Sequence, residues 1–200
     1  CITDPGSTTC FAVLFAAINP FTKQVYILDE IYETDQSNTT IRQIYPRIKA
    51  KMKELNPYID VEDWCKVYDE AAAWFSTELM GQFGDYFMPT AKHLHKKEHG
   101  LSLCKDQMIY DTVIMTDRMQ KLKWESQNYV RTDKGDIPKK NDHLIDCWRY
   151  LNAAANYDMN EIIEKKQNKN NDRGWRRHKD DVNDLAKEID WTWNMIPWED

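Results

Sequence analysis

Residues 2–33 read ITDPGSTTCFAVLFAAINPFTKQVYILDEIYE, and this opening stretch has the pattern of β-strands joined by turns. A first short strand ends at Asp4, where Asp-Pro-Gly is typical of a tight turn. Residues 9–18 are apolar and rich in residue types that favour strands. A second turn over residues 19–23 leads into another strand over residues 24–31. The stretch therefore predicts three strands of one sheet.

The rest of the chain is predicted to add mainly helices. Residues 39–55 place apolar side chains at helical spacing, at Ile41, Ile44, Ile48, Met52 and Leu55. Residues 66–68 and 86–88 predict two short strands, and a helix capped by Asp69 lies between them. Residues 101–119 and 141–158 predict two more helices, and residues 132–136 a hairpin tip. This order is typical of an α/β layered protein with a mixed sheet.

Composition excludes several classes of protein. The longest apolar run, residues 11–18, is too short to span a bilayer, and no secretory leader is expected. Five scattered cysteines without a CxxC pair indicate reduced thiols rather than a disulfide frame or a zinc site, with Cys10 and Cys147 expected to be buried. Neither GxxxxGK[ST] nor GxGxxG occurs, so no nucleotide-binding loop is expected.

The chain is expected to be one domain with a tail, cut from a longer protein because it opens with Cys1 rather than Met. Residues 1–158 are the predicted domain, and residues 159–200 are a charged, partly flexible tail. The basic cluster of the tail could contact phosphates or form a solvated linker. The closing segment WTWNMIPWED, residues 191–200, could dock on a partner or on its own domain. Both alternatives stay open.

Net charge is −6, but the basic residues concentrate between Lys92 and Lys140, immediately before the segment KKNDHLIDCWRYLN, residues 139–152. In a helix, Asp142, Asp146 and Arg149 of this segment fall on one stripe. The opposite stripe, which is expected to be buried, holds Leu144, Trp148, Leu151 and Ala155. A structural interpretation of the acids is that Asn141 caps the helix and the carboxylates complement its dipole.

Three acids lie at the ends of predicted elements: Asp4 ends a strand, Asp69 follows a strand, and Asp146 begins a helix. Each could instead be a turn residue, a cap or a first-turn acid. In α/β sheets, however, the ends of neighbouring strands converge on one edge. Converging carboxylates are hard oxygen ligands that favour Mg²⁺ or Mn²⁺. Two such ions, about 3.5–4 Å apart, can hydrolyse a phosphodiester.

Three motifs carry a resemblance to a known family. They are the Asp-Pro-Gly-Ser strand end at Asp4, YDEAA around Asp69, and NDHLIDCWRY at residues 141–150. In this order they resemble the nuclease domain of tailed-bacteriophage terminase large subunits, and more broadly the ribonuclease-H-like superfamily. Cys147 stands where the family usually has Ala, and Glu70 stands where Pro is common, which leaves Glu70 as a stand-in for Asp69. The resemblance covers roughly residues 1–158.

The resemblance implies a ribonuclease-H-like fold, with a mixed central sheet flanked by helices, and a metal-dependent endonuclease that cuts concatemeric viral DNA during genome packaging in the host cytoplasm. It implies that two Mg²⁺ or Mn²⁺ ions are held by Asp4, Asp69 and Asp146, with Asp142 as an accessory ligand. The residues expected to border double-stranded DNA are Lys139, Lys140, Arg131 and Lys134. The implied partners are an N-terminal ATPase domain in the full-length chain, the portal protein and the small terminase subunit.

Alternative functions stay open at this point. One class comprises other nucleases of the same scaffold, such as a junction resolvase or an RNA–DNA hybrid nuclease. Another is a DNA-binding or portal-binding module without cleavage. The segment HLHKKEH, residues 93–99, fits no metal-site spacing and is interpreted as a surface segment. Trp74 and Phe75 are expected in the core, and Arg149 is expected to pair with Asp142 or Asp146.

Overall fold

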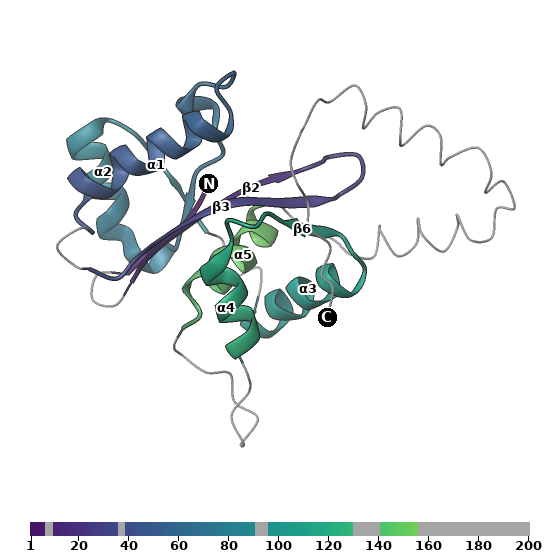
Figure 1. The fold of residues 1–200 in the computed structure, drawn as a ribbon. Coiled ribbons are helices and arrows are strands. Elements are labelled where there is room, and N and C mark those ends of the chain that lie inside the picture. Colours follow the sequence, from purple (N-terminus) through teal and green to yellow (C-terminus); the bar gives the residue numbers. More distant parts are fainter. Residues whose placement is uncertain (7–9, 36–38, 91–95, 130–140, 156–200) are drawn as a thin grey trace, which may run out of the picture. The chain divides into compact units, whose positions relative to one another are not determined.

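The computed structural model describes residues 1–6, 10–35, 39–90, 96–129 and 141–155. These residues form a mixed sheet with the strand order β5-β4-β1-β2-β3-β6, flanked by helices (Figure 1). The strands are β1 Ile2–Pro5, β2 Phe11–Ile18, β3 Val25–Glu33, β4 Val67–Tyr68, β5 Met88–Pro89 and β6 Val113–Met115. The α-helices are α1 Ile41–Leu55, α2 Ala73–Phe83, α3 Lys97–Ile109, α4 Gln120–Asn128 and α5 His143–Ala154. Two short 3₁₀ helices are η2 Val61–Asp63 and η3 Glu70–Ala72.

The strand β1 lies in the interior of the sheet. It pairs antiparallel with β2 and parallel with β4, and β3 continues the sheet from β2. The short strands β5 and β6 add parallel to β4 and β3. This mixed sheet confirms the predicted α/β fold class.

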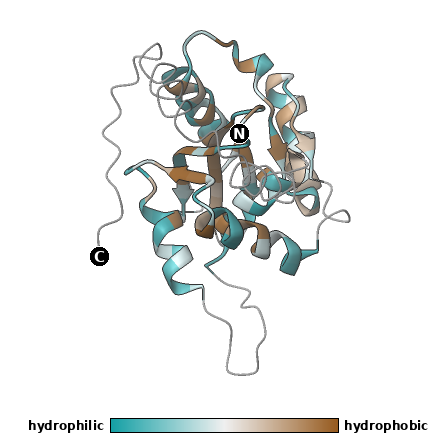
Figure 2. Ribbon diagram, turned by 90° about the vertical axis from the view of Figure 1, so that its right-hand side faces the viewer, coloured by the Kyte–Doolittle hydropathy of each residue, from teal (hydrophilic) through white to brown (hydrophobic). Residues whose placement is uncertain are grey.

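The sheet separates two groups of helices. In Figure 1, α1 and α2 lie on one side of β2 and β3, and α3, α4 and α5 lie on the other. Alternate residues of β2, which are Phe11, Val13 and Phe15, belong to the core cluster that also contains the buried faces of α1 and α2. In Figure 2 the hydrophobic colouring concentrates in the strands between the two groups of helices.

The other face of the sheet carries α5. Ala12 and Leu14 of β2 alternate with the α1-facing residues, and they pair with Asp4 and Ile2 of β1. Directly opposed residues of neighbouring strands point to the same face. Asp4 therefore points to the α5 side of the sheet, and this orientation places its carboxylate among the side chains of α5.

Several predicted elements agree with the structure to within about two residues at their ends. The predicted helix of residues 39–55 is α1, and its residues Ile41, Ile44, Ile48 and Met52 are buried. Phe75 is buried and Trp74 packs partly buried against the same cluster, as expected for core residues. Cys10 and Cys147 are also buried, and the cysteines of the described ranges are free thiols.

The predicted helix over residues 101–119 is confirmed only as far as Ile109, and its second half is wrong. The helix α3 ends at Ile109 because Asp111 adopts a left-handed conformation with φ 51°, and Thr112 N–H donates to the Gln107 carbonyl at 2.9 Å. Residues 113–115 then form the edge strand β6. The helix α4 follows over residues 120–128, which were given no element from the sequence.

The helix α5 begins two residues later than its predicted start and ends at Ala154 rather than near residue 158. Asp142, not Asn141, occupies the N-cap position, and Asn141 has a left-handed backbone with φ 54°. Leu144, Trp148 and Leu151 are buried as expected, whereas Ala155 lies beyond the helix and is exposed. Of the helices in the described ranges, none combines the length and the hydropathy that crossing a bilayer requires.

Candidate active site

Asp4 and Asp69 lie side by side at the ends of two parallel strands. Thr3 of β1 is opposite Tyr68 of β4, and Asp69 N–H donates to the Thr3 carbonyl at 3.0 Å. One residue further along the same register, Asp4 is opposite Asp69. The turn after Asp4 requires glycine at position 6, because a Cβ there would lie 2.0 Å from the Cys10 carbonyl oxygen.

Both oxygens of the Asp69 carboxylate accept hydrogen bonds. Oδ1 accepts from Ala71 N–H at 2.8 Å, so Asp69 caps η3, the turn that leads into α2. Oδ2 accepts from the Tyr150 hydroxyl of α5 at 2.8 Å. Asp69 is buried, whereas its neighbour Glu70 is exposed. The structure thus turns Asp69, and not Glu70, toward α5.

Asp4 is paired with His143, the first residue of α5. The Nδ1 atom of His143 lies 2.8 Å from Asp4 Oδ2. This hydrogen bond raises the pKa of His143, whereas burial of the ring lowers the pKa by a smaller amount. The contact joins the end of β1 to the start of α5.

Asp142 and Asp146 share one cation, Lys97 at the start of α3. Lys97 Nζ lies 2.6 Å from Asp142 Oδ2 and 3.6 Å from Asp146 Oδ1. Arg149 Nε donates to Asp146 Oδ1 at 3.0 Å, which confirms the expected pairing of Arg149. Burial nevertheless raises the pKa of Asp146, although Arg149 and Lys97 oppose the shift. Burial therefore disfavours the ionised form of Asp146, and the neighbouring cations compensate this desolvation only in part.

The Tyr150 hydroxyl contacts Asp69 and lies within the electrostatic influence of two further acids. Burial raises the pKa of Tyr150, and the negative charges of Asp146, Asp69 and Asp4 raise it further. These carboxylates come from α5, from the end of β4 and from the end of β1. Segments separated by more than sixty residues thus place negative charge around one side chain.

The sequence does not indicate the role of three residues of this site. Lys97 lies in the predicted surface segment 93–99, Tyr150 lies in the third motif, and Glu125 lies in a stretch without a motif. Glu125 of α4 is fully buried, and its Oε2 accepts from Leu144 N–H at 2.9 Å and from Ile145 N–H at 3.1 Å. For Lys97, the only signal in the sequence is the lysine pair at residues 96–97, one turn before the apolar part of α3.

The described residues contain no group of three His, Cys, Asp or Glu side chains that is already arranged around a metal position. Each acid of the site contacts a protein donor instead. The residues predicted to border DNA, which are Lys139, Lys140, Arg131 and Lys134, lie outside the described residues, as does the tail 159–200.

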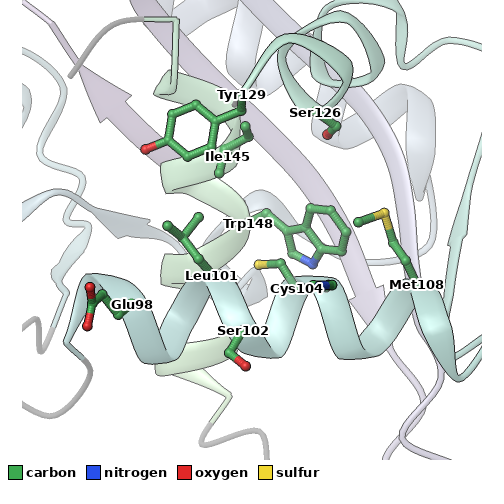
Figure 3. Close-up of a pocket in the computed structure, with 10 residues that line it drawn as sticks. Glu98, Leu101, Ser102, Cys104, Met108, Ser126, Tyr129, Ile145 and Trp148 are labelled. Atoms are coloured by element: carbon green, nitrogen blue, oxygen red, sulfur yellow. The ribbon is translucent and has the colours of Figure 1, made fainter. Parts of the chain in front are cut away.

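A pocket of about 440 Å³ lies beside the acids rather than on them. It is lined by side chains of α3, α4 and α5, among them Leu101, Cys104, Met108, Ser126 and Trp148 (Figure 3). Tyr129 reaches from this pocket toward the acids, because its hydroxyl lies 3.4 Å from Asp142 Oδ2. The lining also includes the charged side chains Glu98 and Lys105, whereas Asp4, Asp69 and Asp146 do not line the pocket.

The mixed sheet and its flanking helices have the fold of terminase nuclease domains. The P22 large terminase nuclease domain superimposes with a TM-score of 0.62 at 15% identity, over 78% of this chain and 80% of that chain. The nuclease domain of the large terminase from bacteriophage SPP1, with bound Mn, gives a TM-score of 0.58 at 18% identity, over 76% and 84% of the two chains.

A longer protein matches over a smaller share of its own chain. The large terminase from a thermophilic bacteriophage, in complex with ADP, gives a TM-score of 0.58 at 18% identity over 74% of this chain. The match spans only 37% of that terminase chain. No protein-family model matches the sequence, and no curated protein matches it significantly. At these identities the likeness establishes the fold.

Proposed function

We propose that this chain is a metal-dependent DNA endonuclease that cuts concatemeric viral DNA during genome packaging. The observation that carries the proposal is that Asp4 and Asp69 lie opposite each other on adjacent parallel strands. Helix α5, which carries Asp146, contacts both acids through His143 and Tyr150. Burying several carboxylates together costs free energy unless cations compensate them. A fold shared with terminase nuclease domains supports the same function, including one from SPP1 that holds Mn.

The donor set fits Mg²⁺ or Mn²⁺, because carboxylate oxygens are the ligands that both ions prefer. Asp4, Asp69 and Asp146 would hold the metal, two ions in all, with Asp142 as an accessory ligand. Bound there, the ions would activate a water molecule and stabilise the departing oxygen of the phosphodiester. Asp4 and Asp69 are the natural pair for one ion, since their strands are adjacent and parallel.

The side chains around the acids hold charge and protons in place. Lys97 and Arg149 bring positive charge to Asp142 and Asp146, on the edge where a phosphate would approach. His143 holds a proton against Asp4 and fixes the orientation of that carboxylate. Tyr150 donates to Asp69 and fixes it in the same way.

The substrate and partners follow from the same proposal. Double-stranded DNA would be bordered by Lys139, Lys140, Arg131 and Lys134, which contact phosphates rather than bases, so sequence preference is weak. The chain would work beside an N-terminal ATPase domain, the portal protein and the small terminase subunit in the host cytoplasm. The terminase from the thermophilic bacteriophage, in complex with ADP, matches over only part of its length and supports the ATPase partner.

The test is cleavage of supercoiled and linear plasmid with Mg²⁺, Mn²⁺ or a chelator. The wild-type chain is compared with Asp146→Asn and with Asp63→Asn, a matched control at an exposed acid of η2. We expect metal-dependent cleavage that is lost in Asp146→Asn and unchanged in Asp63→Asn. Equal cleavage by both variants would contradict the proposal. A preference for four-way junctions or RNA–DNA hybrids over linear duplex would redirect it to another nuclease of this fold.

One observation favours a second candidate, a DNA-binding or portal-binding module without catalysis. Asp4, Asp69, Asp142 and Asp146 each contact a side chain donor of the chain itself, so their charges already have protein partners. In such a module the acids would only stabilise the fold. Binding of duplex DNA without Mn²⁺ affinity or cleavage, in a folded chain, would establish this alternative.

A further inference from the structure

We propose that Glu125 is a positioning residue for α5. It caps the start of this helix in place of Asp142, which leaves the Asp142 carboxylate available to the site. The consequence for metal binding rests on the proposed function, whereas the capping does not.

The start of α5 is capped from another helix. The first N–H groups of an α-helix have no partner within the helix and usually bond to the side chain of the N-cap residue. Asp142 occupies that position but makes no capping hydrogen bond. Glu125 Oε2 accepts from both Leu144 N–H and Ile145 N–H instead, at 2.9 and 3.1 Å.

The Asp142 carboxylate points elsewhere. Its Oδ2 lies 2.6 Å from Lys97 Nζ and 3.4 Å from the Tyr129 hydroxyl. The backbone of Asp142, with φ −129° and ψ 11°, also departs from the extended conformation typical of a capping residue. An acid at the N-cap position would normally turn back to the helix, so its outward direction requires another acceptor for the amides.

The two α5 amides are the backbone donors to Glu125, and the Tyr32 hydroxyl and the nearby His143 ring also favour its charged form. Glu125 is fully buried beneath α5, and burial raises its pKa, with the N–H groups of Ile145 and Leu144 opposing the shift. A buried carboxylate costs free energy that an apolar residue of the same size would not. The hydrogen bonds to α5 and the positive end of the helix dipole offset that cost.

The helix that carries Glu125 is anchored in the same way. The N-cap residue Met119 of α4 makes no side-chain cap, and Glu30 of β3 accepts from Lys121 N–H at 2.6 Å and Leu122 N–H at 2.9 Å. Glu30 therefore attaches α4 to the sheet, and Glu125 attaches α5 to α4. The start of α5 is located relative to the sheet through these two carboxylates.

The capped turn is the one that carries the site. Asp142, His143 and Asp146 immediately surround the amides of Leu144 and Ile145. A displacement of this turn would move the proposed ligands relative to Asp4 and Asp69. Supporting residues of metal ligands typically alter metal affinity about 10- to 100-fold when they are changed.

Two substitutions distinguish the effect of the side-chain length of Glu125 from the effect of its charge. Glu125→Gln keeps an acceptor oxygen at the same reach without the charge. Glu125→Asp keeps the charge but is one methylene too short to reach α5. Each variant of the 200-residue chain is titrated with Mn²⁺ alone by calorimetry, and amide hydrogen exchange is measured at Leu144 and Ile145.

We expect Glu125→Gln to bind Mn²⁺ and protect both amides nearly as the wild type does. Glu125→Asp is expected to lose about tenfold or more in Mn²⁺ affinity and to expose both amides. The reverse order, with Glu125→Asp normal and Glu125→Gln defective, would show that charge matters and would overturn the proposal. Unchanged Mn²⁺ affinity in both variants would overturn it as well.

A third variant keeps the test decisive if Glu125→Asp does not fold. Asp142→Ala should leave the protection of Leu144 and Ile145 amides unchanged, and their loss of protection would identify Asp142 as the cap and overturn the proposal. A wild-type chain that binds no Mn²⁺ would count against the proposed function. The exchange pattern would still decide whether Glu125 caps α5.

Discussion

At the scale of single residues, Asp146 combines burial with a charge that its neighbours only partly compensate. Burial raises its pKa above the ordinary value of 3.8 despite Arg149 and Lys97. A raised pKa means that the folded chain binds the proton more tightly than the unfolded chain. The contribution of Asp146 to stability is therefore full at acid pH and falls as pH rises through the folded pKa.

We predict that Asp146→Asn is at least as stable as the wild type at pH 7, although the proposed nuclease activity falls by more than about 100-fold. The asparagine carries no charge, so it avoids the desolvation cost that burial imposes on the carboxylate. The substitution also removes a proposed metal ligand. Loss of a ligand is expected to reduce activity more than loss of a supporting residue, which typically costs about 10- to 100-fold. Urea unfolding at pH 7 and pH 4 measures the stability difference, which should shrink at the lower pH. A strongly destabilised variant would instead show that Asp146 serves the fold.

We further predict that Tyr150→Phe destabilises the fold and loosens the site. The hydroxyl donates to the Asp69 carboxylate at 2.8 Å in a buried position, and a hydrogen bond to a charged group contributes about 1.5–3 kcal/mol. Thermal unfolding should show that loss, and a Mn²⁺ titration should show weaker binding. Tyr58→Phe is the matched control, because Tyr58 is 96% exposed. Equal Mn²⁺ affinity in the two variants would contradict a role of Tyr150 in holding Asp69.

At the scale of elements, the sequence predicted those whose signals are local. Asp4 and Asp69 were predicted at strand ends because a turn motif and a short apolar run mark each position. The break at Asp111 was missed because apolar residues continue on both sides of it, from Leu103 to Met115. The three residues of β6 are too few to show alternation, and they form a strand only because β3 lies beside them.

The partners of the acids lie beyond what a local pattern can show. Glu125 caps a helix that begins 18 residues later, and Lys97 reaches Asp142 across 45 residues. Tyr150 meets Asp69 across 81 residues. Such contacts depend on how α3, α4 and α5 pack against the sheet. The sequence therefore indicates which acids are candidate ligands, but it does not indicate which side chains form hydrogen bonds or ion pairs with them.

The attachment of α1 and α2 to the sheet gives a prediction at this same scale. Asp85, just after α2, accepts from Lys66 Nζ at 2.6 Å and from the Tyr45 hydroxyl of α1. Burial would raise the pKa of Asp85, but these hydrogen bonds outweigh it and lower the pKa. A lowered pKa contributes stability above the ordinary value of 3.8, and this stability is lost as pH falls through the folded pKa.

We predict that Asp85→Ala costs about 3 kcal/mol or more at neutral pH, because Lys66 is left buried without its carboxylate. The difference from the wild type should narrow below about pH 3.8. Urea unfolding across this pH range measures both effects, with Asp63→Ala as an exposed control. A pH-independent difference would show that packing, rather than the ion pair, accounts for the loss.

At the scale of the whole molecule, net charge and local charge are expected to act in opposite directions on the proposed binding of DNA. The chain carries −6 overall, which repels a polyanion at long range, yet its basic residues gather between Lys92 and Lys140. The repulsion between the acidic remainder and DNA is screened over about 8 Å at physiological salt, whereas direct phosphate contacts persist. The affinity for DNA should therefore come from a few contacts between basic side chains and phosphates. Each such contact releases a counterion and should increase the dependence of affinity on salt concentration.

We predict that Lys139→Ala combined with Lys140→Ala weakens duplex binding equally for all sequences. It should also flatten the plot of log affinity against log salt by up to about 1.8, since each phosphate contact contributes about 0.9 to the slope. The measurement is DNA binding over a series of salt concentrations with Ca²⁺ in place of Mg²⁺, beside Lys49→Ala with Lys53→Ala in α1 as a control of equal charge. The control pair should lower affinity slightly through net charge but leave the slope unchanged. If the control flattens the slope and the first pair does not, DNA approaches the α1 side of the sheet, away from Asp4, Asp69 and Asp146, and cleavage by these acids becomes untenable.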